Sequence, residues 1–124
     1  MNVVDSSGWL SYFADGPNAQ SFAAPIGSLG ELLVPSITLT EVFKNIQRQR
    51  GEEAALRAIA HMEQGRVVVL DERLAVDAAV FGIEYQLPLA DSIIYATARR
   101  HEATLWTQDA DFKDLTNVKY FPHQ

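Results

Sequence analysis

The chain of 124 residues contains no cysteine. This absence excludes a disulfide framework and thiol catalysis, and it fits a protein of the reducing cytoplasm. The sequence also lacks the glycine-rich loops GxxxxGK[ST] and GxGxxG, so it gives no support for a nucleotide cofactor. Its three histidines, His61, His101 and His123, do not match the spacing of a zinc motif.

Positive charge and long apolar runs are also scarce. Ten Lys and Arg residues stand against 16 Asp and Glu residues, which gives a net charge of −6 and a pI near 4.9. This balance argues against broad, non-specific binding of nucleic acids, which uses a basic face. It does not exclude a nucleic-acid enzyme, because a metal ion or a partner can supply the positive charge. No apolar stretch is long enough to cross a membrane and no signal sequence precedes the first strand pattern, so we expect a cytoplasmic protein.

Apolar residues make up 48% of the chain, which is enough for a hydrophobic core, and the length suits one domain over residues 1–124. Short apolar runs alternate with segments of helical periodicity. This alternation predicts an α/β fold, a three-layer sandwich in which helices cover both faces of a central parallel sheet of four to five strands. The expected strands are the runs 3–4, 32–35 (closed by Pro35), 67–70, 104–106 and 118–121.

Three details of the pattern make more specific predictions. The run from Val67 to Leu70 is continuously apolar, which is typical of a strand buried on both faces. The stretch 25–30 contains a proline and two glycines and interrupts a helical pattern, which predicts a broken second helix. The next helix is expected to open at Thr38, with Thr38 and Glu41 spaced as a capping box.

Four acidic residues stand where an apolar strand gives way to a helix, or in the first turn of a helix: Asp5, Glu41, Asp91 and Asp109. In an open parallel sheet such positions converge outside the carboxyl ends of the strands. Carboxylates gathered there repel one another unless a cation binds among them. Mg²⁺ and Mn²⁺ prefer carboxylate and water ligands, and either ion can polarise a phosphoryl oxygen and activate water. The four acids therefore predict metal-dependent hydrolysis of a phosphodiester.

A structural role is the alternative interpretation of the same acids. Asp and Glu stabilise helix starts by accepting hydrogen bonds from free N–H groups and by interacting with the helix dipole. Glu41 fits a capping box, and Asp91 is an ordinary acid of a first turn. Asp71 also follows a strand, so position alone does not separate metal ligands from helix caps.

Four segments together resemble the PIN-domain family, and most closely its VapC-type toxins. They cover nearly the whole chain in the family's order, and they are Asp5-Ser6-Ser7, PSITLTE at 35–41, LADSIIYATA at 89–98 and TLWTQDADF at 104–112. The resemblance implies a PIN-like, Rossmann-like fold and an endoribonuclease directed at single-stranded RNA. It implies that one or two Mg²⁺ or Mn²⁺ ions are held by Asp5, Glu41, Asp91 and Asp109. It also assigns supporting roles to Ser6, Thr107 and Asp111.

The resemblance further implies a homodimer and an antitoxin protein that inserts a segment, often with an arginine, into the acidic site. The stretch 25–30 departs from the regular helix of many relatives, so it leaves the antitoxin and dimer contacts there open. Lys44 and Arg48 share a helix face, four residues apart. Contact with RNA phosphates is one interpretation of this pair, and a solvated helix face is the other.

Two other functions remain open at this point. A receiver-type signalling domain is also a small acidic α/β domain, and Asp71 after the run 67–70 would be its phosphoacceptor. That class needs paired acids after the first strand and a lysine beyond the last one, whereas Asp5 stands alone and Lys119 lies within its expected strand. The second alternative is a catalytically silent PIN-like binding module, which the presence of all four acids argues against.

Overall fold

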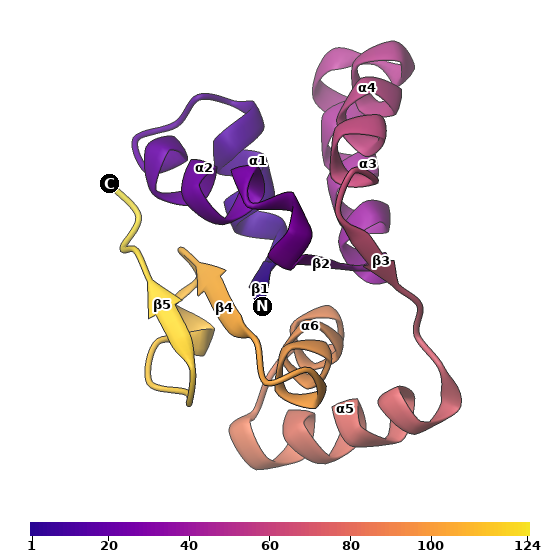
Figure 1. The fold of residues 1–124 in the computed structure, drawn as a ribbon, viewed down its shortest axis with the longest axis vertical. Helices are drawn as coiled ribbons and strands as arrows, with labels where there is room; N and C mark the ends of the chain where they lie inside the picture. Colours follow the sequence, from indigo (N-terminus) through magenta and orange to yellow (C-terminus); the bar gives the residue numbers. More distant parts are fainter.

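The computed structural model describes all 124 residues, in which five strands alternate with six α-helices (Figure 1). The strands are β1 (Asn2–Val4), β2 (Leu32–Pro35), β3 (Arg66–Val68), β4 (Thr104–Thr107) and β5 (Val118–Tyr120). The helices are α1 (Ser6–Phe13), α2 (Ala19–Gly27), α3 (Ser36–Arg50), α4 (Glu52–Met62), α5 (Glu72–Tyr85) and α6 (Leu89–Arg100). Two 3₁₀ turns complete the elements, η1 (Leu29–Glu31) and η2 (Ala110–Phe112).

The strands form one sheet in the order β3-β2-β1-β4-β5, and every neighbouring pair is parallel. β1 is therefore central, with β2 and β4 on either side of it. Because the strands run in one direction, the residues that follow β1 and β4 meet at the same edge of the sheet.

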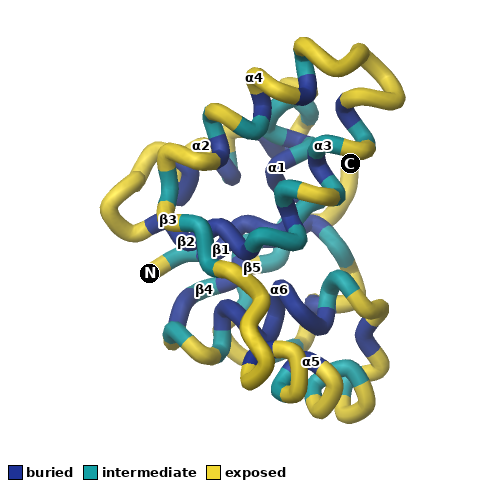
Figure 2. Tube along the Cα trace, turned by 90° about the vertical axis from the view of Figure 1, so that its right-hand side faces the viewer, coloured by how far each residue is buried: buried dark blue, intermediate teal, exposed yellow.

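Helices cover both faces of the sheet, and alternate residues of each strand face opposite layers. Val4 and Val34 belong to one core with α1, α2, α3 and α4, while Val3 and Leu33 belong to a second core with α6. α5 packs on α6 rather than on the sheet (Figure 1). Buried residues follow β1, β2 and the inner sides of the helices (Figure 2). The predicted three-layer α/β sandwich is confirmed. None of the helices has the length and apolar character needed to span a membrane.

The expectation for the third strand is wrong in two respects. β3 ends at Val68 and forms the edge of the sheet, and Val69 and Leu70 are 68% and 43% exposed. A short apolar run is consistent with a doubly buried strand, but its periodicity cannot show where the strand lies in the sheet. The apolar run continues here past the strand into an exposed connection.

The expectations for two helices need correction. Pro25 does not interrupt α2, because it removes only one hydrogen bond from the last turn, but the helix ends at Gly27, within the stretch 25–30, and the separate turn η1 follows. α3 begins at Ser36, directly after Pro35. Thr38 therefore lies inside the first turn, where its hydroxyl donates to the Pro35 carbonyl at 2.6 Å. The predicted capping box with Glu41 is not formed.

Candidate functional site

Asp5 follows the central strand β1 and is the N-cap of α1, with only 2% of its surface exposed. One carboxylate oxygen accepts a hydrogen bond from the Gly8 N–H at 2.8 Å, and the other accepts from the Thr107 hydroxyl at 2.6 Å. The Ser7 hydroxyl lies 2.8 and 2.9 Å from the two oxygens. The carboxylate is thus fixed from both α1 and β4.

The end of β4 connects Asp5 to the next acid. The Thr107 hydroxyl accepts a hydrogen bond from the Asp109 N–H at 2.9 Å while it donates to Asp5. Asp109 in turn caps η2, because its carboxylate accepts from the Asp111 N–H at 2.9 Å. One buried hydroxyl therefore sets the relative positions of two acidic residues that are far apart in the sequence.

Glu41 lies inside α3 and reaches the site from a neighbouring helix. Its Oε1 accepts a hydrogen bond from the Ser6 hydroxyl at 2.6 Å. Because this partner belongs to α1, the side chain does not serve the start of its own helix, and its second oxygen has no protein donor.

Three carboxylates form a tight group at the carboxyl edge of the sheet. Oxygens of Asp91, Asp109 and Asp111 all lie within 4.8 Å of one another. Asp91 sits in the first turn of α6, which has no side-chain cap. Two oxygens on opposite sides of one Mg²⁺ ion stand about 4.2 Å apart, since each Mg–O distance is near 2.1 Å. The donor set and its spacing therefore suit a small hard cation.

The charge states of these acids reflect their crowding. Burial raises the pKa of Asp91 to about 7, and the negative charges of Asp109, Asp5, Glu41 and Asp111 add to the increase. Burial also raises the pKa of Asp5 to about 6, although three hydrogen bonds act in the opposite direction. The charge on Asp91 thus responds to four other acids, which places all five in one electrostatic neighbourhood.

The structure groups the predicted residues in a way that the sequence did not indicate. Asp111, expected in a supporting role, lies in the tight group with Asp91 and Asp109. Asp5 and Glu41 lie close enough to affect the pKa of Asp91, but they are outside that group. The Ser6 hydroxyl donates a hydrogen bond to Glu41, and the Thr107 hydroxyl donates one to Asp5.

Asp71 lies apart from this site. Its carboxylate caps α5 by accepting from the Leu74 N–H at 2.8 Å, and both of its oxygens lie 3.0 Å from the Arg100 guanidinium. These partners lower its pKa. Asp71 is therefore a structural helix cap paired with an arginine, which gives no support to a phosphoacceptor role.

Sequence reasoning missed a polar chain beside the acids. The Ser7 hydroxyl, which contacts Asp5, also lies 3.4 Å from the Gln108 N–H, and the Gln108 amide contacts His123 and Asn18 at 2.9 and 3.1 Å. Gln108 is 8% exposed. Its place directly before Asp109 was a usable signal, whereas the contacts with Asn18 and His123 depend on tertiary structure.

Comparisons with known proteins agree with this geometry. A family model described as PIN domain matches residues 3–118. No curated protein matches the chain. Among solved structures, a toxin–antitoxin complex from Klebsiella pneumoniae has a TM-score of 0.83 and 22% identity, covering 98% of this chain and 99% of its own.

Two other solved structures show the same fold over nearly their full length. VapC20 from Mycobacterium tuberculosis, a toxin that cleaves the sarcin–ricin loop, has a TM-score of 0.81 and 20% identity, covering 98% of this chain and 100% of its own. VapBC2 from Rickettsia felis, bound to a promoter DNA fragment, has a TM-score of 0.76 and 14% identity, covering 99% and 98%. At these identities the likeness establishes the fold alone.

Proposed function

Since this chain belongs to the PIN-domain family, we propose that it is a metal-dependent endoribonuclease and the toxin of a VapC-type toxin–antitoxin pair. The observation that carries the proposal is the group of Asp91, Asp109 and Asp111 at the carboxyl edge of the sheet. Burial raises the pKa of Asp91 to about 7, the negative charges of Asp109, Asp5, Glu41 and Asp111 add to the increase, and a bound cation would offset both effects. The proposed ligands are Asp91 and Asp109, with Asp111 close enough to join them and Asp5 and Glu41 beside them.

Mg²⁺ or Mn²⁺ bound there would polarise the phosphoryl group and acidify the attacking water. Residues of the chain itself hold the acids of the site in fixed positions. Asp5 is held by Thr107 and Ser7 and so fixes one side of the acidic site. Glu41 is held at one oxygen by Ser6, and its other oxygen is free to orient the attacking water and accept its proton.

The partners proposed for this chain are RNA, an antitoxin protein and a second copy of the chain. The solved structures of similar fold include toxin–antitoxin complexes and an RNA-cleaving toxin, which supports the first two. We propose that the chain acts in the cytoplasm, where its RNA substrate is found, and that residues 1–124 form one domain. The match over residues 3–118 supports the domain assignment.

Cleavage of single-stranded RNA by the purified chain, with and without Mg²⁺ or Mn²⁺, tests the proposal. We expect cleavage only with the ion, and we expect Asp91→Asn and Asp109→Asn each to lower kcat/KM by at least about a hundredfold, since each substitution removes a charged oxygen ligand. Asp114→Asn is the matched control, because Asp114 is exposed and lies outside the tight group.

Circular dichroism must show that the variants remain folded. Cleavage that persists in chelator, or that survives Asp91→Asn at the wild-type rate, would exclude the proposed metal site. If the wild-type protein binds RNA but does not cleave it with either ion, the chain is a silent binding module instead.

A further inference from the structure

Three adjoining cavities form one groove between α1 and the pair α3–α4. The middle cavity has a volume of about 380 Å³, and its neighbours have volumes of about 240 and 260 Å³. Leu10 and Asn45 line both the first and the middle cavity, while Phe13, Ile46 and Arg50 line both the middle and the last. We call this continuous feature the α1–α3 groove.

The α1–α3 groove begins at the acidic site. Its first cavity is lined by Ser6 and Glu41, the hydrogen-bonded pair described above. The middle cavity is lined by Ser7, whose hydroxyl contacts Asp5, and by Gln108, which directly precedes Asp109 in the sequence. A polymer that places one phosphodiester among the acids can therefore continue into the groove without leaving the surface.

Unpaired cations line the groove of this acidic protein. Lys44, Arg48 and Arg50 are exposed on α3 and line the first two cavities. The fold contains only two salt bridges, and both involve other basic residues. Lys44 and Arg48 are also a like-charged pair four residues apart, which destabilises a helix slightly. Arg48 and Arg50 also stand in the last turn of α3, where positive charge interacts favourably with the helix dipole. The dipole does not account for Lys44 in the middle of the helix, whereas attraction of an anionic ligand accounts for all three residues.

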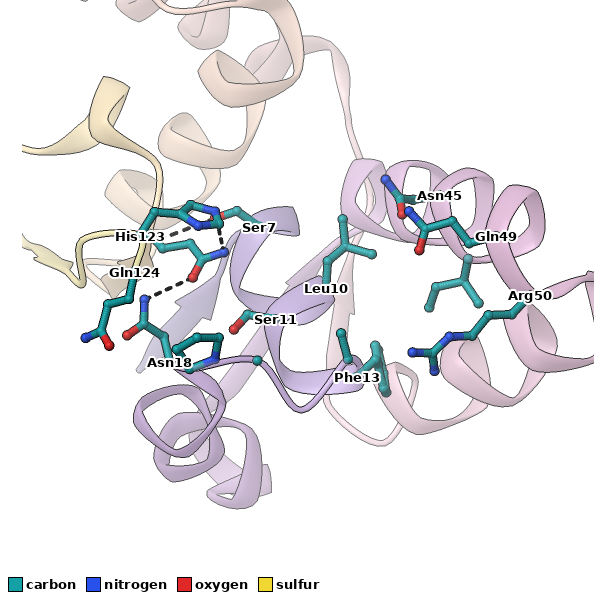
Figure 3. A pocket seen from close by; sticks show the side chains of 15 residues that line it. Ser7, Leu10, Ser11, Phe13, Asn18, Asn45, Gln49, Arg50, His123 and Gln124 are labelled. Atoms are coloured by element: carbon teal, nitrogen blue, oxygen red, sulfur yellow. Dashed lines mark hydrogen bonds between the residues drawn. The ribbon is translucent and has the colours of Figure 1, made fainter.

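The remaining lining supplies groups that suit nucleobases. Asn45, Gln49 and Arg50 project from α3 toward Leu10 and Phe13 of α1 (Figure 3). Side-chain amides can donate to and accept from base edges, and Phe13 offers an aromatic surface. Cations with polar and aromatic side chains along one groove are typical of single-strand binding.

We propose that the α1–α3 groove binds the single-stranded RNA that continues from the cleaved phosphodiester. Phosphates contact Lys44, Arg48 and Arg50, and bases face the amides of α3. From Glu41 to Arg50 the helix rises about 14 Å at 1.5 Å per residue, a length that accommodates a few nucleotides. The assignment rests on the proposed ribonuclease function, because it takes the RNA substrate from it.

The test measures RNA binding separately from cleavage. In an Asp91→Asn background, which prevents turnover, fluorescence anisotropy follows binding of a labelled single-stranded RNA of about 12 nucleotides over a range of salt concentrations. We expect Arg48→Ala with Arg50→Ala to weaken binding about tenfold at low salt. The slope of log affinity against log salt should fall in magnitude by about 1.4, since each lost phosphate contact removes about 0.7.

The matched control is the double variant Arg66→Ala with Arg73→Ala, which removes the same charge from exposed positions on β3 and α5. We expect it to keep the affinity and slope of the background protein. Equal losses in both double variants would overturn the groove assignment, because they would show a general charge effect. An unchanged affinity and slope in the groove variant would also overturn it, leaving a peptide of a protein partner as the candidate occupant.

The outcomes separate this inference from the proposed function. RNA binding that depends on Arg48 and Arg50 supports the groove even if the wild-type chain fails to cleave RNA. Metal-dependent cleavage together with RNA binding that does not depend on Arg48 and Arg50 would support the ribonuclease function and overturn the assignment of RNA to the groove.

Discussion

Asp5 and Asp71 occupy the same local position, since each caps a helix that follows a strand, yet their carboxyl groups have opposite pKa shifts. Asp5 is buried beside other acids, and burial raises its pKa to about 6. Asp71 is exposed, and its hydrogen bonds to the Leu74 N–H and Arg100 lower its pKa. Local sequence therefore sets the capping geometry, whereas the tertiary neighbours decide whether the acid is strained or satisfied.

The strain at Asp91 predicts that Asp91→Asn stabilises the metal-free protein at pH 8. The pKa of Asp91 is about 7 in the fold and 3.8 ordinarily, so the native state binds more protons than the unfolded state between about pH 4 and pH 7. The free energy of unfolding therefore falls as pH rises through this window. Asparagine mimics the neutral acid, so we expect the substitution to raise the free energy of unfolding at pH 8 by about 1–2 kcal/mol. This value is discounted because the carboxylate is partly exposed. Urea denaturation at pH 4 and pH 8 with chelator measures the difference.

The comparison at low pH provides an internal control for this prediction. Near pH 4 the wild-type side chain is already protonated in the fold, so the variant and wild type should differ little. Mg²⁺ at pH 8 should stabilise the wild type more than Asp91→Asn, because only the wild type keeps the full set of charged oxygens. A variant that is less stable than wild type at pH 8 in chelator contradicts the raised pKa of Asp91.

At the scale of elements, the site depends on a close approach of α1 to β1 and α2. A Cβ atom at Gly8 would lie 2.7 Å from Val4 Cγ1 and 2.8 Å from Phe22 Cε1. Gly8→Ala should therefore push α1 outward and cost about 1–3 kcal/mol, as overpacking does. Because the Gly8 N–H holds Asp5, we also expect lower RNA cleavage. Urea denaturation and initial cleavage rates measure the two effects.

Gly27→Ala is the control for that substitution. Gly27 is the last residue of α2, and a Cβ atom there meets nothing within 4 Å. Alanine at this position should leave stability unchanged or raise it by up to about 1 kcal/mol through the unfolded state. If Gly8→Ala behaves like Gly27→Ala, the packing at α1 is looser than the distances indicate.

The elements themselves were largely predictable from the sequence. Alternating apolar runs and helical periodicity predicted all five strands and the layers on both faces, because burial requirements repeat with the period of each element. The order of the strands was not predicted, which is why Val69 and Leu70 were expected to be buried. Pro35 closes the second strand as predicted, whereas Pro25 does not break α2, because a proline in the last turn removes only one hydrogen bond.

The site was predictable to the extent that it follows from topology. Residues at the carboxyl ends of parallel strands must lie at one edge, and on that basis the sequence predicts that Asp5 and Asp109 face the same rim. The tighter grouping of Asp111 with Asp91 depends on the turn η2, whose shape follows from the cap that Asp109 makes. Side-chain partners such as Ser6 with Glu41 join residues 35 positions apart, so no local pattern indicates them.

For the whole molecule, the net charge of −6 conceals an uneven distribution. Asp91 and four other acids lie together at the carboxyl edge of the sheet. Lys44, Arg48 and Arg50 line the α1–α3 groove next to them. Opposite charges on adjoining surfaces suit a substrate whose backbone lies in the basic groove while one phosphodiester reaches a metal ion in the acidic rim. Under the proposed function, this arrangement would let an acidic protein hold an RNA strand.

Several exposed apolar residues lie along α5 and the segments flanking it, and much of α5 is exposed (Figure 2). They are Val69, Leu70, Val76, Val80, Ile83 and Leu89, each at least 43% exposed. Val76, Val80 and Ile83 follow the spacing i, i+4, i+7 and so form one stripe on α5. A contiguous apolar stripe on a helix is typical of a protein interface, and it supports the proposed homodimer.

Ile83→Glu should therefore convert a wild-type dimer into a monomer. Ile83 is 83% exposed, so the substitution does not disturb the fold of one chain, whereas in a dimer it would bury a charge at a self-complementary contact. Sedimentation equilibrium at micromolar protein concentration measures the mass, and circular dichroism checks the fold. Leu56→Glu is the matched control, because Leu56 is an exposed apolar residue on α4, 53% exposed and outside the stripe. A wild-type chain that sediments as a monomer, or an Ile83→Glu variant that remains dimeric, would show that α5 does not form the interface.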